Sequence, residues 1–333
     1  MVIFQFPDRV EHGGRVRWHQ DAEGRRPLDF SANLNPFPPD IPWKPDPCLL
    51  TDYPDDTYHA LKSLIARHFH RDEEEITLGN GSIEVLRSFC YASIQSGDLV
   101  RIDPPTFGEY ALSAGLAGGR VEPRIEHAKV WFICNPNNPT GTFLPREALS
   151  AELEMTRREG GVLCIDEAFI ELAGPQESLI GVRDPSLFIL RSLTKSFAVP
   201  GLRFGFGVGD PDLIARMEVI RPPWNVNAFA ADFARVALSH YHVLEESMQR
   251  IAGERAWLTG ALRERGIELV PPSANFILLH LHRDARRLSE EMLAHGVLVR
   301  DCTSFGLPQS IRIAVRTREE NRVFLEAFDA CMR

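Results

Sequence analysis

The chain has 333 residues, and its 37 lysine and arginine residues against 46 aspartate and glutamate residues give a formal net charge of −9. This acidic balance disfavours a duplex nucleic acid or an anionic membrane surface as the main partner. Hydrophobic residues make up 44% and charged residues 25%, as in ordinary globular proteins, and no apolar run approaches the roughly 20 residues that span a bilayer. A small molecule remains the open class of partner.

The N-terminus and the cysteines bear on the compartment. The stretch from Met1 to Pro7 is short and has no basic lead-in, so it is not a secretory signal, and a cytoplasmic location is expected. The cysteines are far apart and form no CxxC pair, which argues against a zinc site or a disulfide framework. We therefore expect no metal, and buried free thiols at Cys48, Cys90, Cys134, Cys164, Cys302 and Cys331.

The first elements along the chain are an extended arm and a helix. Residues 35 to 47 are rich in proline, which fixes φ and removes backbone donors, so no helix is expected to start there. Apolar residues then recur at helical spacing, at Tyr58, Leu61, Leu64, Ile65 and Phe69. This stripe predicts a helix over 57 to 69.

Short apolar runs then alternate with amphipathic stretches. Strands are predicted at 76 to 78, 99 to 102, 130 to 134, 162 to 165 and 187 to 190, and helices include 82 to 95 and 146 to 159. Such alternation indicates an α/β fold with a mostly parallel sheet, and the charge-free strand interiors indicate that helices cover both faces.

The C-terminal third has a different pattern. A long helical region is predicted from 225 to about 265, followed by strands at 276 to 279, 297 to 299 and 311 to 315, with helices between and after them. This order favours a smaller α+β domain. We therefore divide the chain into an N-terminal arm with a small-domain segment (1–45), a large domain (46–230), and a connecting helix with the C-terminal small domain (231–333).

Polar residues follow the predicted strands, at the sheet edge where α/β proteins bind ligands. They lie in the segments 79–82, 135–141, 166–167 and 191–195. Gly79-Asn80-Gly81-Ser82 precedes a helix, so its free N–H groups would suit a phosphate monoester, although taken alone such a segment is more often a plain turn capped by Ser82. The run Gly205 to Gly209 lacks the third helical glycine of a dinucleotide fingerprint, so nicotinamide binding is excluded.

Three spaced motifs resemble those of the pyridoxal-phosphate enzymes of aminotransferase fold type I. They are Asn138-Pro139-Thr140-Gly141, Asp166-Glu167-Ala168-Phe169, and Ser192-Leu193-Thr194-Lys195 followed by Arg203. The resemblance covers essentially the whole chain. It implies a large domain whose mixed, mostly parallel sheet lies between helices, a smaller α+β C-terminal domain, and pyridoxal 5'-phosphate as the cofactor.

The resemblance also implies a role for each site residue. Lys195 would bind the cofactor aldehyde covalently, and Asp166 would pair with the pyridine nitrogen so that the ring can accept electrons. Asn138 would contact the phenolic oxygen, and Phe107 would stack on the ring. Further groups would hold the cofactor phosphate or come from the neighbouring subunit of a homodimer: Gly81, Ser82, Ile83, Ser192 and Arg203 for the phosphate, and Tyr53 from the neighbour.

Within that fold the chain resembles two subfamilies that both bind small phosphorylated amino substrates. One comprises the threonine-phosphate decarboxylases of cobalamin biosynthesis, and the other the histidinol-phosphate aminotransferases. The segments 12–14, 29–36, 190–203 and 223–227 are more similar to the decarboxylases. Phe169 stands where many aminotransferases have a tyrosine, and it cannot donate a hydrogen bond to the phenolic oxygen, although drift within either subfamily would explain it equally.

The decarboxylase resemblance predicts that L-threonine O-3-phosphate loses carbon dioxide to give (R)-1-amino-2-propanol O-2-phosphate. Orientation of the substrate would select this reaction, through groups expected to bind it: His12, Asn33, Arg300 and Arg316. A surface arginine is the competing interpretation of Arg300. The alternatives are transamination of histidinol phosphate with 2-oxoglutarate, and a binding protein that keeps the fold without the chemistry.

Overall fold

The computed structural model describes residues 7–19, 24 and 26–333. The helices of these residues are α1 (His59–Phe69), α2 (Ser82–Ser93), α3 (Glu109–Leu116), α4 (Arg146–Arg158), α5 (Leu193–Ser196), α6 (Pro211–Ile220), α7 (Ala228–Ser239), α8 (Leu244–Glu264), α9 (Ala285–Ala294) and α10 (Arg318–Cys331). Short 3-10 helices include η2 (Pro47–Leu50), η4 (Ile170–Leu172) and η6 (Tyr241–Val243).

The strands of the described residues fall into three sheets. The largest has the order β2-β8-β7-β6-β5-β3-β4, and β3 to β7 run parallel while β8 is antiparallel to both of its neighbours. Its strands are β2 (Ile76–Asn80), β3 (Leu99–Ile102), β4 (Arg120–Glu122), β5 (Val130–Cys134), β6 (Val162–Asp166), β7 (Leu187–Ser192) and β8 (Phe204–Val208). The expected α/β architecture with a mostly parallel mixed sheet is therefore confirmed.

Alternation along the central strands builds a core on each face of this sheet. Trp131 of β5 packs in one cluster with α1, α4 and α7, whereas its neighbours Val130 and Phe132 pack in another with α2, α3 and α6. Successive side chains of a strand point to opposite faces, so an uninterrupted apolar strand is stable only when helices cover both. The prediction that both faces are covered is thus correct.

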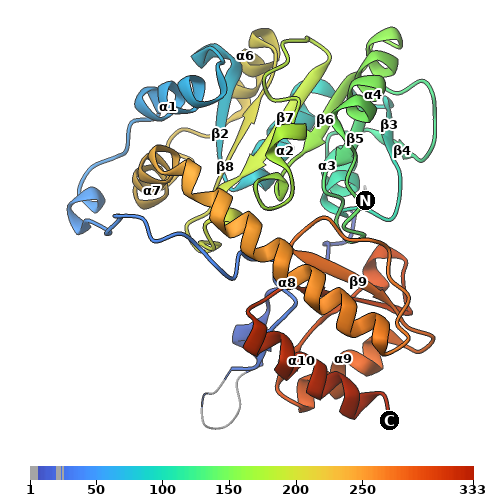
Figure 1. The fold of residues 1–333 in the computed structure, drawn as a ribbon. Coiled ribbons are helices and arrows are strands. Elements are labelled where there is room, and N and C mark those ends of the chain that lie inside the picture. Colours follow the sequence, from blue (N-terminus) through green and yellow to red (C-terminus); the bar gives the residue numbers. More distant parts are fainter. Residues whose placement is uncertain (1–6, 20–23, 25) are drawn as a thin grey trace, which may run out of the picture.

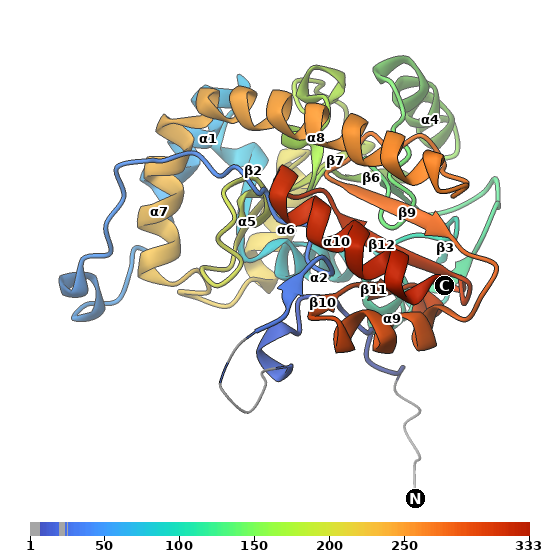
Figure 2. The ribbon, with the colours of Figure 1, turned by 60° about the horizontal axis from the view of Figure 1, so that its bottom comes forward.

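The lower part of Figure 1 holds a smaller sheet with its own core, reached by the long helix α8. Strand β12 (Ser310–Ala314) pairs antiparallel with β9 (Phe276–His280) and with β11 (Arg300–Asp301). The N-terminal arm joins this part, because β1 (Leu28–Asp29) pairs with β10 (Val297–Leu298) and Phe30 lies in the same core (Figure 2).

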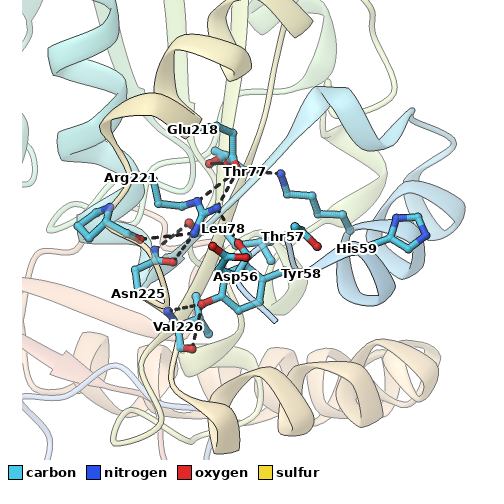
Figure 3. A network of polar contacts seen from close by, with 12 residues as sticks. Asp56, Thr57, Tyr58, His59, Thr77, Leu78, Glu218, Arg221, Asn225 and Val226 are labelled. Carbon is cyan, nitrogen blue, oxygen red and sulfur yellow. Dashed lines mark hydrogen bonds and ion pairs between the residues drawn. The ribbon is translucent and has the colours of Figure 1, made fainter. Parts of the chain in front are cut away.

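A polar network fastens the segment before α1 to the segment after α6 (Figure 3). The Tyr58 hydroxyl accepts from the backbone N–H of Val226 at 3.0 Å and donates to its carbonyl at 3.1 Å. Arg221 donates to the side chain of Asn225 at 3.0 Å and to the carbonyl of Asp56 at 2.8 Å. Two loops far apart in sequence are therefore held together without a covalent link.

Some details differ from the sequence predictions. The 3-10 helix η2 starts at Pro47, where its Asp46 cap accepts from Cys48 N, so a helical turn does begin at the end of the proline-rich arm. The helical region after 225 is two helices, α7 and α8, broken around His240.

Cys48 is exposed and Cys331 is half-buried, so the prediction of buried thiols is wrong for these two. Among the described residues no helix is long and apolar enough to cross a membrane.

Candidate active site

A cavity of about 690 Å³ lies where β5, β6 and β7 end. The order of the sheet places those carboxyl ends side by side, so the polar residues that follow each strand converge there. The N-terminal arm forms a second wall and the small sheet a third. Most of the residues selected from the sequence line it: His12, Asn33, Ser82, Ile83, Phe107, Asn138, Asp166, Ser192, Lys195, Arg203 and Arg300.

Lys195 stands on the single turn of α5, directly after β7. Its side chain is partly exposed to the cavity but enclosed by protein, and this burial lowers the pKa of its amine to about 8. Arg312 and Arg203 lower the pKa further by repulsion, and Asp166 opposes them. A larger fraction of this amine is therefore unprotonated near neutral pH than of an ordinary lysine.

The rate at which the apoprotein captures pyridoxal phosphate should rise through a midpoint near pH 8, because only the unprotonated amine attacks an aldehyde. A lysine with a pKa of about 8 is roughly a tenth unprotonated at pH 7, about three hundred times more than an ordinary lysine. Stopped-flow absorbance from pH 6 to 10 tests this, with free Nα-acetyl-lysine to correct for titration of the cofactor. A rate that still climbed tenfold per pH unit above pH 9 would contradict it.

Asp166 ends β6 and is buried, with the side chain facing the cavity. Its carboxylate accepts from the Tyr110 hydroxyl at 2.7 Å and from the backbone N–H of Ala168 at 3.0 Å. Burial raises the pKa of Asp166 to about 6, although these hydrogen bonds and Lys195 lower it. Among the described residues it forms no ion pair, so its charge is available to a ligand.

Asn138 follows β5 and is also buried. Arg312 donates to its side-chain oxygen, which leaves the amide nitrogen as the donor for a ligand in the cavity. Phe169 lies on the cavity wall and packs edge-on against Phe276, with ring centroids 5.1 Å apart. It offers the cavity an apolar surface and no hydrogen bond.

A cradle of hydrogen-bond donors is formed where β8 packs against the start of α2. Gly81 has φ +79°, a conformation that favours glycine, and its lack of a Cβ lets Nη2 of Arg203 lie 2.2 Å from where that atom would be. A Cβ at Gly205 would likewise lie 2.4 Å from the backbone nitrogen of Ser82. Gly81 itself is outside the cavity lining, but it allows the Arg203 guanidinium to approach the free N–H groups at the helix start.

The N-terminal arm connects both walls of the cavity. His12 lies 2.8 Å from Glu109 of α3, with its ring centroid 5.8 Å from that of Phe107. On the other side, Arg300 donates to the carbonyl of Glu11 at 2.8 Å. The arm thus brings a histidine into a cavity that is otherwise built from residues far downstream. Arg300 is buried, contrary to its interpretation as a surface arginine.

Arg316 does not line the cavity, contrary to expectation. Its guanidinium donates to the carbonyl of Asp29 at 3.0 Å and to Glu320 at 2.7 Å, within the capping box of α10. Arg312, four residues earlier on β12, lines the cavity instead. Alternate residues of an extended segment share a face, so the sequence pattern did not separate the two arginines. In the structure β12 ends at Ala314, so Arg312 lies on the strand and Arg316 lies beyond it.

Two further features were outside the reach of the sequence predictions. Tyr110 is fully buried and lines the cavity, but its partner Asp166 is 56 positions away in the sequence. Tyr53 is 80% exposed and lies outside the cavity of its own chain, with its ring centroid 4.6 Å from that of Trp224 and the two ring planes tilted by 32°. Its expected place in a neighbouring subunit's site stays a prediction.

The cavity suits the group that the resemblance implies. A lysine amine and a carboxylate, neither in an ion pair with a described residue, face the same space, and a donor cradle stands at one end. An aldehyde, a pyridine nitrogen and a phosphate would occupy these three positions. Lys195, Asp166 and the start of α2 with Arg203 are therefore the residues that would hold pyridoxal phosphate.

Comparison with known proteins decides the family. The family model "Aminotransferase class I and II" matches residues 49–124 and 122–328. The chain belongs to this aminotransferase family. Family members are pyridoxal-phosphate enzymes, and a histidinol-phosphate aminotransferase from Sinorhizobium meliloti, solved in complex with pyridoxal-5'-phosphate, superposes with a TM-score of 0.81 at 22% identity, over 95% of this chain and 93% of that one.

Two curated relatives bear on the subfamily. The histidinol-phosphate aminotransferase of Symbiobacterium thermophilum is 33% identical over 298 residues, covering 84% of this chain and 82% of the relative. A protein of Caldanaerobacter subterraneus, provisionally named a threonine-phosphate decarboxylase, is 32% identical over 345 residues, covering 95% of this chain and 92% of the relative. The two sequence identities are nearly equal, so they do not distinguish between the two subfamilies. The chain is a pyridoxal-phosphate enzyme of this family, and its substrate needs a separate argument.

Proposed function

We propose that this aminotransferase-family enzyme is a decarboxylase of L-threonine O-3-phosphate. The carbon–carbon bond to the carboxylate breaks, carbon dioxide leaves, and a proton takes its place at Cα to give (R)-1-amino-2-propanol O-2-phosphate. When bound, pyridoxal phosphate withdraws the electron pair that the broken bond leaves on Cα. The protein's own contribution is to bind and orient a substrate that carries two anionic groups.

The observation that carries the proposal is a pair of neighbouring buried arginines. Arg300 and Arg312 are direct partners across the antiparallel strands β11 and β12, and they are 8% and 5% exposed. Like charges opposite each other destabilise a sheet, and neither forms an ion pair with a carboxylate of the described residues. Burial lowers the pKa of Arg312 to about 10. An anionic ligand in the cavity would offset this cost.

The two guanidiniums would bind different groups of that ligand. Arg312 contacts Asn138, at the end of the cavity where the cofactor ring would lie, so it would bind the carboxylate on Cα. Arg300 contacts the arm at Glu11 and the hydroxyl of Ser304, and together with His12 it would bind the distal phosphate. A phosphorylated amino acid would occupy both sites together, which would fix which bond to Cα stands over the ring.

The arm gives separate support. It supplies His12 and Asn33 to the cavity, and the similarity to the Caldanaerobacter protein covers 95% of the chain, so it includes at least part of the arm over residues 1–45. The histidinol-phosphate aminotransferase of Symbiobacterium is similar over 84% of the chain. Its identity of 33% is the observation that favours the second candidate, transamination of histidinol phosphate with 2-oxoglutarate. The free thiols of the structure fit a reducing cytoplasm.

The deciding experiment supplies the holoenzyme with L-threonine O-3-phosphate and no keto acid, and follows carbon dioxide and aminopropanol phosphate by mass spectrometry. We expect sustained turnover. If nothing forms, but histidinol phosphate converts the cofactor to its amine form and 2-oxoglutarate restores it, the aminotransferase takes the decarboxylase's place. Binding without either conversion would overturn both in favour of a binding protein.

The roles of Arg300 and Arg312 should be distinguished by changing each to lysine, which keeps the positive charge but loses the planar fork of donors. Arg300→Lys should weaken binding of L-threonine O-3-phosphate about tenfold to a hundredfold and leave L-threonine unaffected, because a charged hydrogen bond contributes about 1.5–3 kcal/mol. Arg312→Lys should weaken both ligands. Spectral titration of each holoenzyme gives the dissociation constants, and an equal effect of Arg300→Lys on both ligands would contradict its assignment to the phosphate.

We also propose that the enzyme is a homodimer in which Tyr53 completes the neighbouring site, supported by the exposure of the Tyr53 and Trp224 rings. Sedimentation at micromolar concentration should give a dimer. Hybrids of Tyr53→Ala and Lys195→Ala chains should then regain activity, because one of the two sites receives both native residues. A fully active monomer, or hybrids without regained activity, would exclude this arrangement.

A further inference from the structure

Asp166 is held by neutral donors on both carboxylate oxygens. The hydroxyl of Tyr110 donates to Oδ2 at 2.7 Å, and the backbone N–H of Ala168 donates to Oδ1 at 3.0 Å. The Ala168 bond is local, because it spans two residues of the same turn. The Tyr110 bond comes from α3, across the sheet edge, so Tyr110 is the side chain that determines where the carboxylate points.

Tyr110 is itself held rigidly. It is fully buried, its ring stacks on Phe132 of β5 with centroids 5.2 Å apart and planes 6° apart, and the edge of Phe107 meets it at 5.5 Å and 80°. These rings fix both torsions of the side chain, so the hydroxyl has one position. Tyr110 thus joins the ring-stacking residue Phe107 to the carboxylate Asp166 through one side chain.

We propose that Tyr110 is a positioning residue that holds the Asp166 carboxylate, in its anionic form, toward the pyridine nitrogen of the cofactor. This role depends on the cofactor and not on the choice between the two amino substrates. Tyr110 touches neither the substrate nor the reacting atoms in this assignment. It acts through Asp166, whose negative charge keeps the pyridine nitrogen protonated.

The electrostatic surroundings show why a donor is needed here. Burial disfavours the charged carboxylate and Glu171 of η4 repels it, whereas Lys195 of α5 attracts it. The other titratable groups near it are the thiols of Cys134 and Cys164, whose pKa burial raises, so they stay neutral. A hydrogen bond to the anion lowers its pKa, and Tyr110 provides the only side-chain bond to Asp166 among the described residues.

The test is the substitution Tyr110→Phe, which removes one oxygen and keeps the packed ring. The ligand is pyridoxamine 5'-phosphate, which has no aldehyde and so binds the apoprotein without involving the Lys195 amine. We expect the affinity of the variant to be about tenfold below wild type near pH 5.5 and equal to it above pH 8, because loss of the donor raises the pKa of Asp166 by about one unit. Titration of the ligand itself cancels in this ratio.

A matched control is Tyr58→Phe, which removes the other buried hydroxyl described above, bonded to the backbone of Val226. The ratio of the affinity of Tyr58→Phe for pyridoxamine 5'-phosphate to that of wild type should be constant across the pH range. A ratio for Tyr110→Phe that was also constant, whether one or below one, would overturn the proposal, since lost packing would not depend on pH.

A double-mutant cycle isolates the pair. In an Asp166→Asn background no carboxylate remains to ionise, so adding Tyr110→Phe should produce no pH-dependent change in affinity. A pH-dependent loss that persisted in this background would mean that Tyr110 acts through another group. These binding measurements use no substrate, so they stand whether the enzyme proves to be a decarboxylase or an aminotransferase.

Discussion

Replacing Lys195 with alanine should lower turnover by about ten-thousandfold or more, the size of effect seen when a covalent catalyst is removed. The same variant should lose the visible absorbance of the protein-bound cofactor, and borohydride should no longer fix the cofactor to the chain. Both follow because the side chain is the one lysine that lines the cavity among the described residues. Cofactor that remained reducibly attached would show that another lysine carries the link.

The loss of turnover in Lys195→Ala should come from the missing amine and not from a failure of the chain to fold. The Lys195 amine makes no hydrogen bond or ion pair with a described residue, and its lowered pKa means that burying it charged costs free energy. The thermal midpoint of the apoprotein should therefore remain close to that of wild type. Lys195→Arg is the matched control, because it keeps the charge and should be equally inactive. Partial recovery of Lys195→Ala by added methylamine would identify the missing group as an amine.

The sequence predicted the large sheet well because its strands are short apolar runs that end in turn residues. The runs at 99–102 and 130–134 coincide with β3 and β5. Fold rules then place the residues after such strands at one edge, so Asn138, Asp166 and Lys195 could be assigned to one site before any coordinates. Those assignments depend on chain order and strand direction, which a linear sequence does carry.

What the sequence missed depends on distances it does not contain. Arg312 stands on β12, which ends at Ala314, whereas Arg316 lies two residues beyond the strand, where Asp29 and Glu320 hold its guanidinium away from the cavity. Similarly, Gly205 and Gly207 belong to β8, next to the edge strand β2, and Gly209 follows β8 directly. A Cβ at Gly207 would lie 2.3 Å from the ring of Phe188. Close approach of two elements, and not a nucleotide, accounts for this glycine pattern.

Behind the site, Arg191 lies between two buried carboxylates. It donates to Glu167 at 2.8 Å and to Glu171 at 2.7 Å, and all three side chains are at most 2% exposed. Although burial opposes the charge, the two carboxylates raise the pKa of Arg191. Glu167 follows Asp166, and Ser196, the neighbour of Lys195, donates to Glu171 at 3.2 Å. The two principal site residues therefore share one buried ionic support.

Arg191→Met should lower the free energy of unfolding by about 3–5 kcal/mol at pH 7, because it leaves two buried carboxylates without their cation. Urea unfolding monitored by tryptophan fluorescence measures this. The matched control is Arg287→Met on the exposed face of α9, where a pair with Glu291 should contribute less than about 1 kcal/mol. A loss for Arg191→Met no larger than for Arg287→Met would show that the buried charges are otherwise compensated.

The stability of Arg191→Met should depend on pH in a definite direction. Burial already raises the pKa of Glu167 in the native protein, and removing Arg191 takes away the first of the groups that lower it. A folded state whose carboxyl pKa exceeds the unfolded value binds protons more readily, so its stability increases as the pH falls. The difference in the free energy of unfolding between wild type and Arg191→Met should therefore shrink from pH 7 to pH 5. A difference caused by lost packing volume would stay constant.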